Sequence, residues 1–257
     1  MFNETLLTDA LSGTPLSLSL FPTIDSTNSE AKRYAMNGGR LPALFLAEEQ
    51  TAGRGRMGRS FFSPKSTGIY LSILLKTDDA LSDPITATTA SAVAVRCAIL
   101  AVTGCSAGIK WVNDLYFEGK KICGILAESF FVGQERFLIV GVGVNLSTTD
   151  FPEELRDKAG SLFSCETNLR DALAAELAKR LWEILTSPSD FMNEYRAASI
   201  VLGQAITYCQ NGVERIGVAE AIDDLGRLTV RHEDGTTCLL ASGEISLKIH
   251  DDKGETK

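Results

Sequence analysis

The sequence predicts an α+β fold: a mixed, largely antiparallel sheet with flanking helices, followed by a small C-terminal β-barrel. Three observations predict it. Strand-like and helix-like patterns alternate over the first hundred residues, and three strand patterns then follow one another closely between residues 108 and 146. Short β-branched runs with hairpin turn signals fill residues 203–249. We therefore expect two domains, residues 1–202 and residues 203–257.

The N-terminal elements follow from local patterns. Leu16–Phe21 alternates apolar and polar residues, which predicts a strand. Thr27 and Glu30 have the spacing of a capping box, which predicts a short helix from about Asn28 to Asn37, ended by two glycines. Further strands are predicted at Ala43–Glu49 and Gly68–Lys76, with a Gly- and Arg-rich loop at 50–65 between them.

A long helix and an antiparallel meander are predicted next. Asp83 and Pro84 supply an N-cap and a first-turn proline, and Gly104 ends the helix. Short turns at Glu118-Gly119 and Val132-Gly133 connect the strands of the meander. These strands are Gly108–Val112 with Leu115–Phe117, Lys121–Phe130 and Arg136–Leu146.

One more helical region precedes the barrel. Asn168 is the predicted N-cap of a helix with a leucine stripe at positions 169, 173, 177, 181 and 185. Pro188 is expected to end it and to open a second short helix. About five barrel strands are predicted over Gly203–Ile249, with turns at Asn211-Gly212, Leu225-Gly226 and Asp234-Gly235 and a polar tail after them.

Composition excludes several classes of protein. The 257 residues are 44% hydrophobic and 23% charged, as in an ordinary globular protein, and the net charge of −8 argues against a dedicated nucleic-acid binder. The six cysteines form no C-x-x-C pair, and two histidines disfavour a Ser-His-Asp triad or a His-rich metal site. The N-terminus lacks the features of a secretory signal, and the longest apolar stretch contains Arg96 and is predicted to be too short to span a bilayer. We expect a cytoplasmic protein without a membrane partner.

The loop at residues 50–65 carries the strongest chemical signal. Its glycines formally match the dinucleotide-binding fingerprint, but a proline and a strand follow where that fingerprint requires a helix. Arg54, Arg56 and Arg59 remain, separated by glycines. Guanidinium groups bind carboxylates and phosphates, and glycines allow a close backbone approach. The loop is therefore predicted to bind an anion, with a solvated basic loop as the alternative.

Two further segments are candidates. Lys110–Asp114 places a lysine, an amide and a carboxylate at a strand end, where they could orient a nucleotide and a metal, or simply form the polar end of a hairpin. Gly141 and Gly143 lie on one face of a predicted strand. Glycine weakens strands, so the pair indicates close approach by a ligand or another backbone, with a bulge or tight packing as the alternative.

Together these segments resemble biotin protein ligase, the family that attaches biotin to carboxylase carrier domains. The resemblance covers roughly residues 20–250. Its motifs, in the family's order, are Asp25-Ser26-Thr27-Asn28, Gln50 through Arg59, Phe62-Ser63-Pro64, Lys110-Trp111-x-Asn113-Asp114, Lys120-Lys121-Ile-x-Gly124-Ile-Leu, Gly141-x-Gly-x-Asn145 and Gly243-Glu-Ile-Ser-Leu.

The resemblance implies a ligase domain of the class II synthetase type with an SH3-like C-terminal barrel. It implies ATP and Mg²⁺ as cofactors, with no direct protein motif for the metal. The biotin-binding residues it implies are Ser26, Thr27, Asn28, Gln50, Arg54, Gly55, Arg56, Lys121 and Gly124. Those on the ATP or adenylate side are Arg54, Arg56, Arg59, Phe61, Asn113, Asp114, Asn145 and Lys248. Arg54, Arg56 and Lys121 are the implied catalytic residues.

Three positions depart from the family pattern. Val112 stands where the family commonly has proline. Phe61 replaces an aromatic that is often tryptophan, which leaves less area to cover the adenine. Lys248 replaces an arginine, which keeps the charge but loses the bidentate fork.

The implied reaction has two steps. The biotin carboxylate attacks the α-phosphate of ATP, and a carrier lysine then attacks the biotinyl-adenylate. Positioning and charge neutralisation would drive the first step, and closure of residues 50–65 and about 147–163 would exclude water. The implied partner is the carrier domain of acetyl-CoA carboxylase or a related carboxylase, and the protein would be a monomer or homodimer. The alternatives are a lipoate-type ligase of related fold and a non-catalytic module that binds biotin or its adenylate, which would show no turnover.

We also expect no DNA recognition. Some relatives carry an N-terminal helix-turn-helix domain and repress biotin genes, whereas only about 20 residues precede the first motif here. A gel-shift at physiological salt with biotin-operon DNA checks this expectation. Sequence-specific binding that depends on the adenylate would contradict it.

Overall fold

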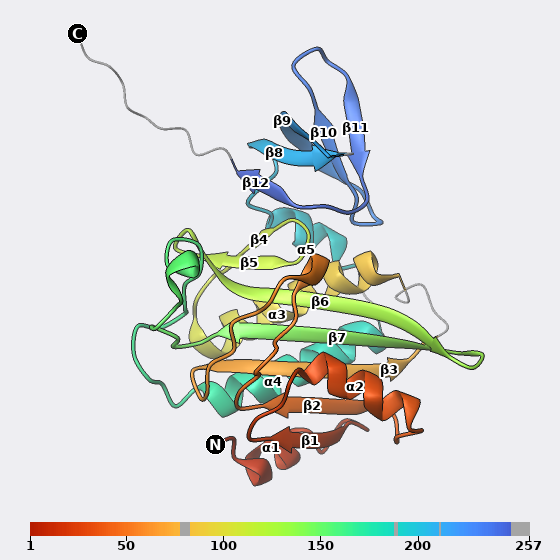
Figure 1. Cartoon of the computed structure of the whole chain (residues 1–257), viewed down its shortest axis with the longest axis vertical. Helices are drawn as coiled ribbons and strands as arrows, with labels where there is room; N and C mark the ends of the chain where they lie inside the picture. The colour runs from red at the N-terminus through yellow and green to blue at the C-terminus, as the bar shows by residue number, and fades with distance from the viewer. Residues whose placement is uncertain (78–82, 188–189, 211, 248–257) are drawn as a thin grey trace.

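The computed structural model describes residues 1–77, 83–187, 190–210 and 212–247 and contains two sheets (Figure 1). The larger has seven strands in the order β1-β2-β3-β7-β6-β5-β4, and the smaller has five in the order β11-β10-β9-β8-β12. The β1–β2 pair is parallel and the other pairs of the larger sheet are antiparallel. The predicted α+β class, with a mixed sheet and a separate C-terminal β-module, is confirmed.

The element bounds follow the sequence patterns closely. The strands of the larger sheet are β1 Ser17–Phe21, β2 Ala43–Ala47, β3 Gly68–Lys76, β4 Gly108–Lys110, β5 Asp114–Phe117, β6 Lys120–Val132 and β7 Glu135–Asn145. The smaller sheet contains β8 Ala205–Gln210, β9 Val213–Ile222, β10 Leu228–Arg231, β11 Thr237–Leu240 and β12 Ile245–Leu247. The helices are α1 Glu4–Ala10, α2 Thr27–Met36, α3 Pro84–Thr103, α4 Arg170–Thr186 and α5 Met192–Ala197, with short 3₁₀ turns η1 at Arg56–Gly58 and η3 at Glu153–Leu155.

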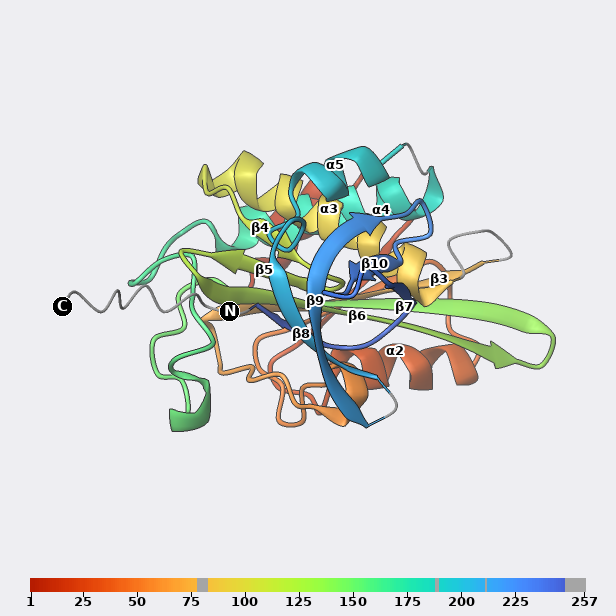
Figure 2. The ribbon, with the colours of Figure 1, turned by 90° about the horizontal axis from the view of Figure 1, so that it is seen from above.

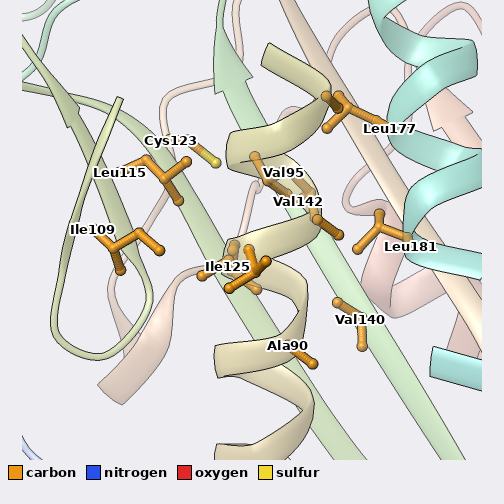
Figure 3. Close-up of a cluster of buried hydrophobic side chains, with 14 of the residues drawn as sticks. Ala90, Val95, Ile109, Leu115, Cys123, Ile125, Val140, Val142, Leu177 and Leu181 are labelled. Atoms are coloured by element: carbon orange, nitrogen blue, oxygen red, sulfur yellow. The ribbon is translucent and has the colours of Figure 1, made fainter. Parts of the chain in front are cut away.

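Helices cover both faces of the larger sheet. Figure 2 shows α3, α4 and α5 on one side of the sheet and α2 on the other. Val140 and Val142 of β7 pack with Val95 of α3 and Leu181 of α4 in the larger apolar core (Figure 3). Because neighbouring strand residues point to opposite faces, Gly141 must point to the α2 face. That face carries the candidate site.

Two helix starts differ from the prediction. Helix α2 begins at Thr27 with Ser26 as its N-cap, and Ser26 makes no side-chain capping bond. The Thr27 hydroxyl instead lies 3.1 Å from Gln50 Oε1, so the capping-box interpretation was wrong. Helix α4 begins at Arg170 with Leu169 at the N-cap position and no side-chain cap, so Asn168 is not the cap.

The long helix α3 begins and ends where the sequence predicted. The Asp83 carboxylate accepts from Thr86 N, and Gly104 adopts a left-handed φ of 73°. By length and composition α3 could cross a membrane, which corrects the expectation that no segment was long enough. However, 61% of its most apolar window is buried inside the protein, as expected for a core helix. Its packing against α4 and β6 makes it part of the core.

The C-terminal module contacts the larger sheet through buried side chains. Trp111 Nε1 donates to Gly226 O at 2.8 Å, between β9 and β10. The larger core also continues into this module through Ile206 and Ile245. The boundary after residue 202 stays a prediction. Pro188, Asn211, Lys248 and the polar tail lie outside the described residues.

Candidate ligand-binding site

A cavity of about 120 Å³ opens on the α2 face of the larger sheet. Its walls come from the start of α2, the loop after β2, the β4–β5 turn, β6, β7 and the segment before β12. The sequence-predicted residues that line it are Ser26, Thr27, Asn28, Gln50, Arg54, Gly55, Arg56, Arg59, Phe61, Asn113, Asp114, Lys121 and Gly124. The tertiary structure thus gathers residues from six separate motifs around one space.

Two of the predicted site residues, Asn145 and Lys248, are not among the residues that line the cavity. Asn145 is buried beside the cavity, and its Nδ2 donates to Gly160 O at 3.0 Å. Its Oδ1 has no hydrogen-bond partner within the part of the chain that the structure describes. Lys248 lies outside the described residues.

The floor of the cavity depends on glycines in β6 and β7. A Cβ atom on Gly141 would overlap Asn28 Oδ1, and one on Gly143 would overlap the ring of Phe61. A Cβ on Gly124 would lie 3.3 Å from the same ring. β7 pairs with β3 and β6 without a register shift. The glycines are therefore explained by tight packing against the side chains of Asn28 and Phe61, one of the alternatives to approach by a ligand or another backbone, and β7 has no bulge.

One end of the cavity is lined by neutral polar side chains, next to the Arg54–Glu128 ion pair. Ser72 Oγ lies 2.6 Å from Asn28 Oδ1 and 2.7 Å from Thr27 Oγ1. Gln50 Oε1 accepts from Thr27 N at 2.9 Å, and Gln50 Nε2 donates to Ser63 Oγ at 2.9 Å. Sequence reasoning missed Ser72. Its signal was a lone polar residue in the otherwise apolar centre of β3.

The other end carries two lysines. Lys121 Nζ lies 2.7 Å from Asp114 Oδ1, and the Lys121 backbone is fixed by Lys158 O and Gly160 N, each at 2.9 Å. Lys110 belongs to one of the family motifs but is not among the binding residues that the resemblance implies. Its Nζ has no carboxylate within 4.0 Å among the described residues, and burial lowers its pKa. A half-buried, unneutralised ammonium is suited to binding an anion.

The loop at residues 50–65, called the arginine loop below, is folded over the cavity. Phe61 N donates to Gly53 O at 2.8 Å, and Gly55 N donates to Arg59 O at 2.7 Å, so the loop forms a narrow hairpin. Its three arginines reach three different elements. Arg54 pairs with Glu128 of β6, Arg56 Nη1 donates to Asn113 Oδ1 at 3.0 Å, and Arg59 pairs with Glu244 before β12. All three arginines therefore contact other parts of the protein, which the alternative of a purely solvated basic loop does not explain.

The base of this loop is fixed by a buried ion pair. Arg170 Nη1 lies 2.8 Å from Glu48 Oε2, and Ser66 Oγ donates to the same oxygen at 3.1 Å. Burial raises the pKa of Glu48, but Arg170, together with hydrogen bonds from Phe2 N and Ser66 Oγ, holds the pKa below its usual value. Because Glu48 and Ser66 flank the loop, the pair fixes both of its ends on the sheet.

Comparison with known proteins gives a consistent answer. The Biotin/lipoate A/B protein ligase family matches residues 20–145, and the Biotin protein ligase C terminal domain matches residues 201–248. The biotin--[acetyl-CoA-carboxylase] ligase of Mycobacterium tuberculosis is 32% identical over 235 residues, which cover 86% of this chain and 85% of that protein. The corresponding ligase of Paracoccus denitrificans is also 32% identical, over 85% of this chain and 95% of that protein.

Other relatives are longer or share mainly the fold. The bifunctional ligase/repressor BirA of Bacillus spizizenii is 41% identical over 142 residues, but the match spans only 54% of this chain and 44% of that protein. Biotin protein ligase from Aquifex aeolicus, solved in complex with biotin and ATP, superposes with a TM-score of 0.73. It is 24% identical and covers 90% of this chain and 98% of that chain, which supports the fold.

Proposed function

Because the chain belongs to the biotin protein ligase family, we propose that it is an ATP-dependent ligase that activates biotin as biotinyl-5′-AMP and transfers it to a carrier lysine. One observation carries the proposal for this chain. A single cavity joins an end of neutral hydrogen-bonding side chains, next to the Arg54–Glu128 ion pair, to an end that carries Lys110 and Lys121. Biotin has the matching polarity, with a neutral ureido ring at one end and a carboxylate at the other.

Each end of the cavity is proposed to bind one part of the substrates. Thr27, Asn28 and Gln50 would hydrogen-bond the ureido ring, while Gly124 and the ring of Phe61 would border the bicyclic rings. Ser26 and Gly55 would complete this part of the wall. On the other side, Arg56 and Lys121 would contact the biotin carboxylate and the α-phosphate. The nucleotide side would include Arg59, Asn113 and Asp114, with Asn145 and Lys248 as further proposed contacts.

The arginine loop is proposed to move as substrates enter and leave, because its residues 54–57 and 59–61 line the cavity. The arginine loop covers the cavity, so opening its hairpin would make room for both substrates. Closing it again over the adenylate would exclude water from a reactive acyl phosphate.

In the first step, a biotin carboxylate oxygen attacks the α-phosphorus and the bond to the β-phosphate oxygen breaks. Two anions must approach each other, so Arg56, Lys110 and Lys121 would lower the barrier by offsetting their charge. In the second step the carrier lysine attacks the biotinyl carbonyl carbon, and AMP leaves. No protein nucleophile is required in either step.

Magnesium would arrive with the nucleotide. Asp114 and Asn113 line the cavity and could offer one carboxylate and one amide oxygen. Mg²⁺ commonly binds one or two carboxylates together with substrate phosphates, so these residues fit such an ion. When bound, the ion would neutralise phosphate charge. The described residues hold no cluster of three or more His, Cys, Asp or Glu side chains suited to a metal.

The proposed partner is the biotin carrier domain of acetyl-CoA carboxylase or a related carboxylase, in the cytoplasm. Mass spectrometry of such a domain, incubated with the protein, ATP and either biotin or lipoate, tests the function. We expect one biotinyl group on one lysine, together with pyrophosphate release. Preferential lipoylation would support a lipoate-type ligase, and binding without pyrophosphate release would support a non-catalytic module.

Ligand binding is expected to protect the arginine loop. Arg54 and Arg59 of the loop pair with carboxylates, whereas Arg56 has no carboxylate within 4.0 Å among the described residues, and an anionic ligand would neutralise it. Amide hydrogen exchange in this segment should slow when biotinyl-adenylate is added, while exchange in the β9–β10 hairpin stays unchanged. Equal exchange in the loop with and without the ligand would contradict this prediction.

A further inference from the structure

Glu128 is a charged residue of the site to which the proposed reaction gives no role. Its carboxylate accepts two parallel hydrogen bonds from Arg54, from Nη1 to Oε2 at 2.9 Å and from Nη2 to Oε1 at 2.8 Å. This is the bidentate geometry with which a guanidinium binds a carboxylate or a phosphate. While the pair holds, Arg54 cannot offer the same edge to a ligand anion.

The same carboxylate also reaches the polar end of the cavity. Glu128 Oε2 accepts from Asn28 Nδ2 at 2.9 Å, and Asn28 Oδ1 is held in turn by Ser72. Glu128 lies opposite Ile139 of β7 and shares the α2 face with Gly124 and Leu126, because residues two apart in a strand share a face. One side chain therefore connects the arginine loop to the start of α2.

We infer that Glu128 is a positioning residue, whose carboxylate holds Arg54 and Asn28 together and so closes the loop over the end of the cavity proposed for the biotin rings. Arg54 then acts through Glu128 and does not bind the substrate carboxylate or phosphate. The two charges neutralise each other, whereas Arg56 has no carboxylate within 4.0 Å among the described residues. This inference rests on the proposed function, because it assigns the closed loop to biotin.

Charge reversal separates the two roles of Arg54. R54E and E128R each place like charges face to face, which opposes closure of the loop. We expect each single variant to raise the KM for biotin at least about tenfold, at 1.4 kcal/mol per tenfold. Each should also release biotinyl-adenylate faster than wild type. The KM for ATP should stay within about threefold of the wild-type value. The double variant R54E/E128R restores the ion pair but not the hydrogen bond that Glu128 accepts from Asn28, so it should recover part of this loss. If Arg54 binds the ligand anion directly, the double variant will stay as impaired as R54E.

A second variant tests the inference without the double variant, and one of its two readouts needs no ligand. Glu128→Gln keeps the shape of the side chain but removes its charge, so the loop should open more often. Trypsin should then cleave the free protein after Arg54, Arg56 or Arg59 several-fold faster than wild type, and the KM for biotin should rise. Wild-type cleavage and a wild-type KM for Glu128→Gln would overturn the inference.

The matched control is Glu220→Gln in the C-terminal module. Its carboxylate accepts from Arg231 Nε at 3.1 Å at comparable exposure, and neither residue lines the cavity. Cleavage of the loop and the KM for biotin should both be unchanged. If wild type forms no biotinyl-adenylate, the proposed function is wrong, and the trypsin result still decides whether Glu128 holds the loop.

Discussion

Replacing Lys121 by alanine is expected to slow biotinyl-adenylate formation about 30-fold to several-thousand-fold. The Lys121 ammonium lies 2.7 Å from Asp114 Oδ1 and lines the cationic end of the cavity. Loss of a charge-assisted contact inside a closed site costs roughly 2–5 kcal/mol, at about 1.4 kcal/mol per tenfold in rate. Pyrophosphate release in a single turnover measures the effect, with thermal melting as a check on folding.

Lys120 is the matched control for this prediction. Its Nζ donates to Arg156 O at 2.9 Å, and its side chain is exposed outside the cavity wall. An exposed charge contributes little, so Lys120→Ala should stay within a few-fold of wild type. Equal losses in the two variants, or an unimpaired Lys121→Ala, would remove Lys121 from the proposed machinery.

Gly141→Ala should raise the KM for biotin about fivefold to 150-fold, at about 1.4 kcal/mol per tenfold. The added Cβ would overlap Asn28 Oδ1, and β7 cannot easily move because it pairs with β3 and β6 along its length. Asn28 is 3% exposed and is held by Ser72 and Glu128, so it has little room to shift. Overpacking of this kind costs typically 1–3 kcal/mol. Steady-state kinetics with biotin and ATP varied separately should show the larger change for biotin.

Gly13→Ala provides the corresponding control. No atom lies within 4 Å of a Cβ at this position, and its backbone is not left-handed. Its melting temperature and kinetic constants should match those of wild type. Normal biotin affinity in Gly141→Ala would show that Asn28 does not form the biotin end of the cavity.

The fold could be predicted to a large extent because its signals are local. The strand at Gly68–Lys76 was predicted with its observed bounds. The ends of α3 were predicted from the capping side chain of Asp83 and the helix-ending Gly104. The errors also had local causes. Thr27 has the spacing of a capping box, but its hydroxyl lies within hydrogen-bonding distance of Gln50, 23 residues away, which the spacing could not reveal.

The sequence by itself determined which residue types meet at the site. Alternation along β7 placed its glycines on one face, and the resemblance to the family's motifs placed Arg54, Lys121 and Asn28 in one predicted site. Only the tertiary structure decided the partner of each charge. Arg54 pairs with Glu128, 74 residues away, and Arg59 with Glu244, 185 residues away. Periodicity reports the direction of a side chain relative to its own strand or helix. The partners of a side chain depend on how distant elements pack, so three similar arginines in one loop acquired three different surroundings.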